Sequence, residues 1–160
     1  MTWKAMAPAE VCDVIDFFES LSWPFVKSQV QRQAAQRFGW TIEESRNKHY
    51  LVNTASALSE PDVSVISNRE HVLSVDMRTT DIIRKVTEES RRFLDDLFAM
   101  LVREGETRWG AVRIVRDGDR QNALWDTPAG GRIRFTGSDM DILIEYRTPQ
   151  GTELERRQGH

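Results

Sequence analysis

The stretch GRIRFTGSDMDILIEYR, residues 131–147, decides the fold class, because apolar and polar side chains alternate in it twice. Ile133 and Phe135 alternate with arginine and threonine in the first run, and residues 141–146 alternate nearly as cleanly. A period of two residues is typical of a strand with one buried face. Since Gly137 and the serine after it supply turn chemistry between the runs, we predict an antiparallel hairpin.

Residues upstream of this hairpin show the same period after Trp40. We predict four strands there, separated by turn residues, at 40–43, 49–53, 62–66 and 71–76. Sequential hairpins make such a meander antiparallel. Closer to the C-terminal hairpin, Ala123–Trp125 is predicted as one more short strand, while residues 111–116 stay ambiguous between a strand and a helix.

Two short helices are predicted before the meander. Pro8 suits the first position of a helix, and apolar residues then recur at helical spacing as far as Leu21. The second helix is predicted over residues 28–38, with Ser28 as its N-terminal cap and Gly39 after its end.

A longer helix is predicted over residues 87–104, where apolar residues form a wide stripe. Thr87 suits its N-terminal cap, and Gly105 is expected to end it. Helices outside a run of antiparallel strands predict an α+β fold. In this fold an antiparallel sheet, made of the meander and the C-terminal hairpin, packs with two short N-terminal helices and one long central helix.

The chain length and composition indicate one folded domain. The chain has 160 residues, of which 39% are hydrophobic and 29% charged, an ordinary composition that excludes collagen-like, low-complexity and membrane classes. We predict a single domain over residues 1–149 and a flexible tail over 150–160, and no internal repeat is evident. The formal net charge of −3 disfavours non-specific nucleic-acid binding.

The sequence predicts a cytoplasmic location. Its one cysteine, Cys12, cannot form an internal disulfide, and its neighbours on an amphipathic helix indicate a core position. The N-terminus lacks the pattern of a signal peptide. No stretch approaches the ~18 consecutive apolar residues of a membrane span.

Motifs that carry enzyme chemistry are not apparent. The sequence has no G-x-S-x-G elbow and no glycine-rich phosphate loop followed by G-K-[ST]. Asp117 and Asp119 flank a glycine, and Asp139 and Asp141 lie two apart, but neither pair extends to a calcium loop. We therefore expect no catalytic residue, no bound metal and no cofactor, and predict that the protein is not an enzyme.

Partner binding is predicted at one loop and the tryptophans beside it. Trp109 and Trp125 are candidate aromatic anchors, and Asp117, Asp119 and Arg120 form the adjoining charged turn. Tryptophan and arginine concentrate in binding surfaces, and loops often carry recognition. The alternative is that both tryptophans are buried and only seal the edges of the core.

The layout of the chain resembles a group of small actinobacterial proteins. The resemblance covers most of the chain in layout. Its features are Trp23-Pro24 after the first helix, a helix exit at Phe38-Gly39-Trp40, a long helix carrying residues 93–99, and a closing part with Trp125 and Gly130-Gly131. That group is similar to the immunity proteins of polymorphic toxin systems, such as the immunity factor for the tuberculosis necrotizing toxin.

The resemblance implies a stoichiometric inhibitor. It would bind a cognate secreted toxin domain, with an NAD-degrading enzyme as one candidate, and occlude its active site. No nucleic acid and no membrane would be partners. Two alternatives stay open: a secretion or folding chaperone that dimerises around a disordered segment, and a domain that binds a small ligand between its sheet and helix.

Overall fold

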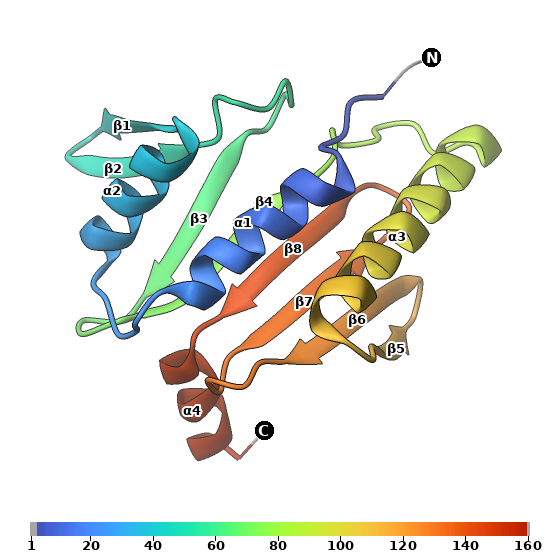
Figure 1. The fold of residues 1–160 in the computed structure, drawn as a ribbon. Coiled ribbons are helices and arrows are strands. Elements are labelled where there is room, and N and C mark those ends of the chain that lie inside the picture. Colours follow the sequence, from blue (N-terminus) through green and yellow to red (C-terminus); the bar gives the residue numbers. More distant parts are fainter. Residues whose placement is uncertain (1–2, 160) are drawn as a thin grey trace.

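Eight antiparallel strands form one twisted sheet in the computed structural model, which describes residues 3–159. The strands are β1 (Thr41–Ser45), β2 (Lys48–Val52), β3 (Asp62–Ser67), β4 (Val72–Arg78), β5 (Arg113–Asp117), β6 (Arg120–Asp126), β7 (Arg132–Gly137) and β8 (Ile142–Arg147). Their order across the sheet is β1-β2-β3-β4-β8-β7-β6-β5 (Figure 1). The strands β4 and β8 therefore pair at the centre, and β1 and β5 form the edges.

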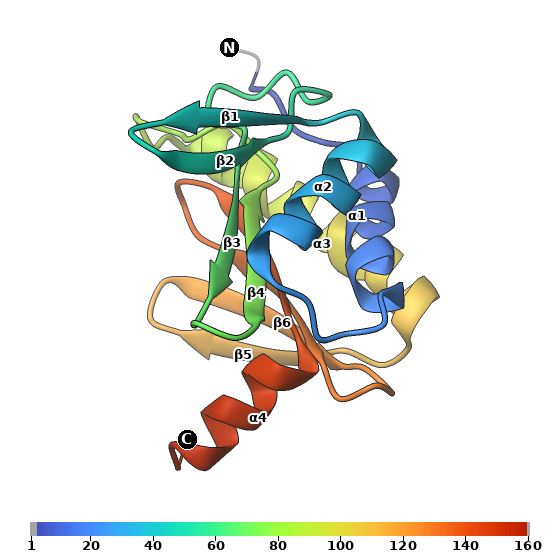
Figure 2. The same ribbon diagram turned by 90° about the vertical axis from the view of Figure 1, so that its left-hand side faces the viewer.

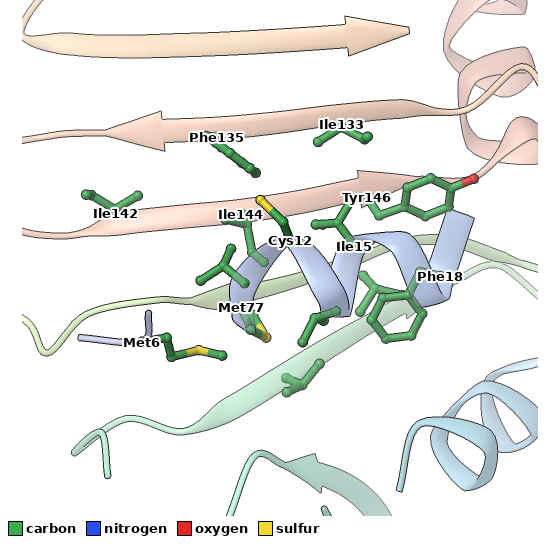
Figure 3. Close-up of a cluster of buried hydrophobic side chains, with 14 of the residues drawn as sticks. Met6, Cys12, Ile15, Phe18, Met77, Ile133, Phe135, Ile142, Ile144 and Tyr146 are labelled. Carbon is green, nitrogen blue, oxygen red and sulfur yellow. The ribbon is translucent and has the colours of Figure 1, made fainter. Parts of the chain in front are cut away.

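Three helices cover one face of the sheet, as Figure 2 shows. They are α1 (Pro8–Ser20), α2 (Lys27–Phe38) and α3 (Glu88–Trp109), and a fourth helix, α4 (Pro149–Arg157), follows β8. The helix α1 crosses the centre of the sheet and packs against α3. Its residues Ile15 and Phe18 join Ile144 and Tyr146 of β8 in the core, together with the buried Cys12 (Figure 3).

The α+β fold predicted from the sequence is confirmed. The meander before α3 is present as β1 to β4, and the hairpin over residues 131–147 is present as β7 and β8. The ambiguous segment 111–116 contains the start of strand β5, which pairs with β6. The C-terminal part is thus a second four-stranded meander rather than a hairpin with one extra strand.

The expected end of the long helix at Gly105 is wrong. The helix α3 continues to Trp109, and Gly110, with φ of 88°, follows it. Gly105 is buried, and a Cβ atom there would lie 2.6 Å from Cη2 of Trp125. This glycine therefore makes room for a tryptophan ring instead of ending the helix.

Two further predictions about helix ends need correction. The helix α2 begins at Lys27, and its N-cap residue is Val26 instead of Ser28. The side chain of Gln29 accepts a hydrogen bond from Val26 N at 3.1 Å. The flexible tail predicted over 150–160 is wrong for residues 150–157, which belong to α4, while His160 lies outside the described residues. Thr148 caps α4 through its Oγ1, which accepts from Gly151 N at 3.0 Å.

The prediction that the chain has no internal repeat is also wrong. Each half contains a helix, α2 or α3, followed by a four-stranded meander. The two meanders join through their last strands, β4 and β8, and their first strands, β1 and β5, form the two edges of the sheet. Both helices end in arginine, an aromatic residue and a glycine with positive φ, at Arg37–Gly39 and Arg108–Gly110. The two halves are thus structural repeats that meet at the β4–β8 pair.

The repeat is closest in β3–β4 and β7–β8. The turn residues Asn68 and Ser138 each donate their N–H to a carbonyl three residues on, both at 3.1 Å. The strand β4 contains one extra residue near its start, where the register of β3 and β4 shifts. After it, Val75–Thr79 matches Ile144–Thr148, and both segments end in arginine and threonine. Thr79 Oγ1 donates to Ile142 O at 3.2 Å, and Thr148 Oγ1 donates to Val72 O at 2.9 Å, which are equivalent bonds.

The register of the central pair shows where the two halves meet. Asp76 and Glu145 occupy the same place in their halves, as partners of Ser64 and Arg134 respectively, and they are also directly opposite each other in the β4–β8 ladder. An approximate twofold axis therefore passes between these two carboxylates.

Candidate functional site: the open face of the sheet

One face of the sheet is left uncovered by α1, α2 and α3, and α4 lies only against its end, where Glu155 pairs with Arg132 and Arg147. Val75, Ile144 and Phe135 point into the core and are almost fully buried, so the residues between them point the other way. We name these outward side chains the open face. It comprises Ser64, Asp76, Arg78, Leu143, Glu145, Arg147, Arg132, Arg134, Thr136, Asn122, Leu124, Asp126, Arg113, Val115, Asp117 and Arg120.

The open face is hollowed near its centre. A depression of about 290 Å³ is lined by Asp76, Asp117, Arg120, Asn122, Arg134, Thr136, Leu143, Ile144 and Glu145. Figure 2 shows that the β1–β2 and β5–β6 hairpins project away from the helices on this side, beyond the central strands. The hollow thus lies on the side of the sheet toward which both terminal hairpins reach, and its walls are mostly polar.

Arginines and carboxylates form a chain of ion pairs across the C-terminal half of the open face. Arg134 lies 2.9 Å and Arg147 lies 3.4 Å from the carboxylate oxygens of Glu145. The chain continues from Arg147 to Glu155 of α4, from Glu155 to Arg132, and from Arg132 to Asp126. Such a network holds its side chains in place more effectively than isolated surface pairs do.

Asp76 lies beside this network without joining its ion pairs. Its Oδ1 is buried and has no hydrogen-bond partner among residues 3–159. Burial, followed by the nearby Glu145 carboxylate, raises the pKa of Asp76 from 3.8 to about 6. A carboxylate that is partly desolvated and incompletely paired destabilises the fold at neutral pH, and such groups concentrate at functional sites.

Of the two predicted aromatic anchors, Trp125 belongs to the core and Trp109 packs against it. Trp125 is 3% exposed, and its Nε1 donates to Gly110 O at 3.0 Å. Trp109 is half-buried against Trp125, and its Nε1 donates to Asp16 Oδ1 at 2.7 Å. The expectation that Trp125 is an exposed anchor is wrong, and Trp109 has its polar atom already engaged within the fold.

The charged turn is where the sequence predicted it, between β5 and β6. Asp117, Asp119 and Arg120 are all exposed, and none forms an ion pair within the described part of the chain. Asp117 and Arg120 line the hollow of the open face. Asp119 and Arg120 line a second depression of about 320 Å³ on the other side, beside α3. Their role in partner binding stays a prediction.

Sequence reasoning missed Asp76, Arg134 and Glu145 as site residues. The alternation that predicted the C-terminal hairpin already placed Arg134 on an outward face, but that pattern alone is ordinary for a solvated strand. The signal that could have found the site is the recurrence of Val-Asp-Met-Arg-Thr at 75–79 as Ile-Glu-Tyr-Arg-Thr at 144–148. It marks the two central strands and their opposed carboxylates.

Among the described residues, the cysteine and the side chains that bind metals do not form a second site. Cys12 is fully buried, and burial raises its pKa to about 12, so its thiol is neutral and unreactive. No cluster of three or more histidine, cysteine, aspartate or glutamate side chains among residues 3–159 could hold a metal ion. In the same residues no helix has the length and apolar character required to cross a membrane.

The fold and site define an α+β protein with a duplicated antiparallel sheet and a charged face that α1, α2 and α3 leave uncovered. Residues 9–148 match the model of a family of unknown function, DUF6301, so the chain belongs to that family. No curated protein and no solved structure matches the chain significantly.

Proposed function

We propose that the protein is a non-catalytic immunity protein that binds a cognate secreted toxin domain through the open face and occludes the active site of that domain. The protein needs neither a cofactor nor a metal for this task. The proposal extends the resemblance to immunity proteins by assigning the contact surface.

The observation that carries the proposal is the incompletely hydrogen-bonded carboxylate of Asp76 at the centre of the open face. One of its oxygens is buried without a hydrogen-bond partner among residues 3–159, which costs stability when the carboxylate is ionised. Residues that lower stability are retained where function requires them. Since Asp76 lines an open hollow and not the core, binding is the function that fits best.

The surroundings of Asp76 support recognition of a protein more than of a small molecule. Charged residues of both signs extend from Arg113 at the edge of the sheet to Arg147 at its centre. Such a mixed pattern allows electrostatic complementarity over a wide surface, which gives specificity and fast association. Ion pairs within the face hold the arginines in place before binding and lower the ordering entropy of association.

The test is protection from the toxin domain encoded beside this protein in its source genome. The two proteins are produced together in a host that the toxin kills, and growth is measured. We expect growth in the presence of the wild-type protein and a stable equimolar complex on size-exclusion chromatography. Continued killing despite abundant folded protein would overturn the proposal.

A pair of variants locates the contact surface in the same assay. The double variant Asp117→Lys with Arg120→Glu exchanges the charges at the rim of the hollow, where neither residue has an ion pair among residues 3–159. We expect it to weaken the complex at least about 10-fold, which corresponds to about 1.4 kcal/mol. The matched control is Arg103→Glu on the exposed surface of α3, which should protect as well as the wild type.

A further inference from the structure

Asp76 and Glu145 are equivalent in the two halves, but the cations beside them are not. In the C-terminal half, Glu145 is opposite Arg134 and pairs with it at 2.9 Å. Arg147, two residues further along the strand, pairs with the other Glu145 oxygen at 3.4 Å. Both oxygens of this carboxylate thus have a guanidinium beside them.

The corresponding positions in the N-terminal half do not provide these cations. The residue opposite Asp76 is Ser64, which is exposed, small and uncharged. The equivalent of Arg147 is Arg78, but its guanidinium is engaged with Asp141 of the β7–β8 turn, with Nε 3.1 Å from Oδ2. The place that Arg134 fills in one half is therefore open in the other half.

We propose that the bound protein supplies the missing cation, as a lysine or arginine side chain that lies over Ser64, at the edge of the hollow, and pairs with Asp76. This inference rests on the proposed function and names the chemistry of the partner at the same site. The incoming cation would lie beside Asp76 and pair with it, as Arg134 lies beside Glu145 and pairs with it.

The arrangement favours a cation over other contacts at this point. Asp76 lines the hollow next to Glu145, whose charge is already balanced by Arg134 and Arg147. Ser74, Arg147 and Arg134 offset the charge of Asp76 only in part. An anion would therefore face a carboxylate with residual negative charge, and an apolar group would desolvate it further. A cation above Ser64 restores the balance that the opposite half has, and charge-assisted hydrogen bonds of this kind are among the stronger ones.

The inference can be tested without the toxin, using a small guanidinium probe. N-acetyl-arginine amide is titrated into isotopically labelled full-length protein and followed by NMR, with the neutral isostere N-acetyl-citrulline amide as control. We expect saturable shifts at Ser64 and Asp76 with arginine amide only. Asp76→Asn should weaken binding at least 5-fold, and shifts that persist in this variant would overturn the inference.

A second pair of variants fills the open place from within the chain. Ser64→Arg supplies the counterpart of Arg134, so it should abolish probe binding at Asp76, whereas the neutral Ser64→Gln should reduce it less than 2-fold. Equal loss in both variants would show that bulk and not charge decides the effect, which contradicts the proposal.

The two proposals fail separately. Arginine amide that binds at Asp76, combined with no protection from the toxin, would leave the cation site standing and remove the immunity function. Protection that survives Ser64→Arg would keep the immunity function and remove the cation site from its interface.

Discussion

The two halves of the sheet are alike under the helices and different on the open face. Equivalent core positions hold similar buried residues, such as Val75 and Ile144, or Met77 and Tyr146. Equivalent outward positions hold Ser64 in one half and Arg134 in the other. Packing against α1, α2 and α3 constrains the covered face, whereas the open face is free to specialise. The difference therefore indicates where this fold carries its function.

The largest expected effect tests whether Trp125 belongs to the core of the C-terminal half. Trp125→Ala removes a buried ring that contacts Trp109 and Phe135, and should lower the free energy of unfolding by about 3–5 kcal/mol. Urea denaturation followed by circular dichroism measures this loss. A loss below about 1 kcal/mol would show that the ring is not part of the core.

The equivalent threonines allow a direct comparison of the halves. Thr79→Val and Thr148→Val each remove a buried hydroxyl that donates to a carbonyl of the other half. Thr148 also caps α4, so Thr148→Val should cost about 2–3 kcal/mol and Thr79→Val about 1–2 kcal/mol. Denaturation of both variants under the same conditions shows which one loses more stability. A larger loss for Thr79→Val than for Thr148→Val would contradict the assigned cap.

The central carboxylates should respond to neutralisation in opposite directions. At pH 7 Asp76→Asn should raise stability by about 1–2 kcal/mol, because it removes a partly buried charge without a full set of partners. Glu145→Gln should lower stability by about 1 kcal/mol, because Arg134 and Arg147 lose their shared partner. Changes of the same sign would contradict the contrast between the halves.

The pH dependence of stability follows from the raised pKa of Asp76. The folded protein holds this proton up to about pH 6, whereas the unfolded chain releases it near 3.8. The contribution of Asp76 to stability therefore falls as the pH rises from about 4 to about 6 and stays low above that range. The difference in the free energy of unfolding between the wild type and Asp76→Asn, measured by denaturation from pH 4 to 7, should show this slope. A difference that does not change with pH would refute it.

The smallest effect is expected at the rim of the hollow. Asp117→Lys with Arg120→Glu should change the free energy of unfolding by less than about 0.5 kcal/mol, because both side chains are exposed and unpaired within residues 3–159. Thermal unfolding should therefore be unchanged within error. A marked loss of stability would mean that binding defects in this variant report misfolding.

Local patterns were enough to predict the layers of the fold. Alternation over residues 131–147 and the wide stripe after Thr87 identified the hairpin and the long helix, and Thr87 is the observed cap. The repeat was missed because its halves share few identical residues outside the segments that end at Thr79 and Thr148. It became visible only through pairing between β4 and β8.

Positions set by distant contacts were not predictable from local signals. Glycine often follows the end of a helix, so Gly105 was expected to end this one. Instead, the ring of Trp125 occupies the space beside Gly105 within the helix. The polar residues after Pro149 suggested a tail, but Glu155 there pairs with Arg132 on the sheet. The charged turn at 117–120 was recognised as a candidate site, whereas Asp76 required the register that places it beside Glu145.

The most direct test of the central claim is the affinity of the purified protein for the toxin domain encoded beside it, measured by calorimetry for three forms. We expect tight equimolar binding for the wild type, at least about 10-fold weaker binding for Asp117→Lys with Arg120→Glu, and unchanged binding for Arg103→Glu. Equal affinity in all three forms would place the interface elsewhere. Failure of the wild-type protein to bind would contradict the immunity function itself.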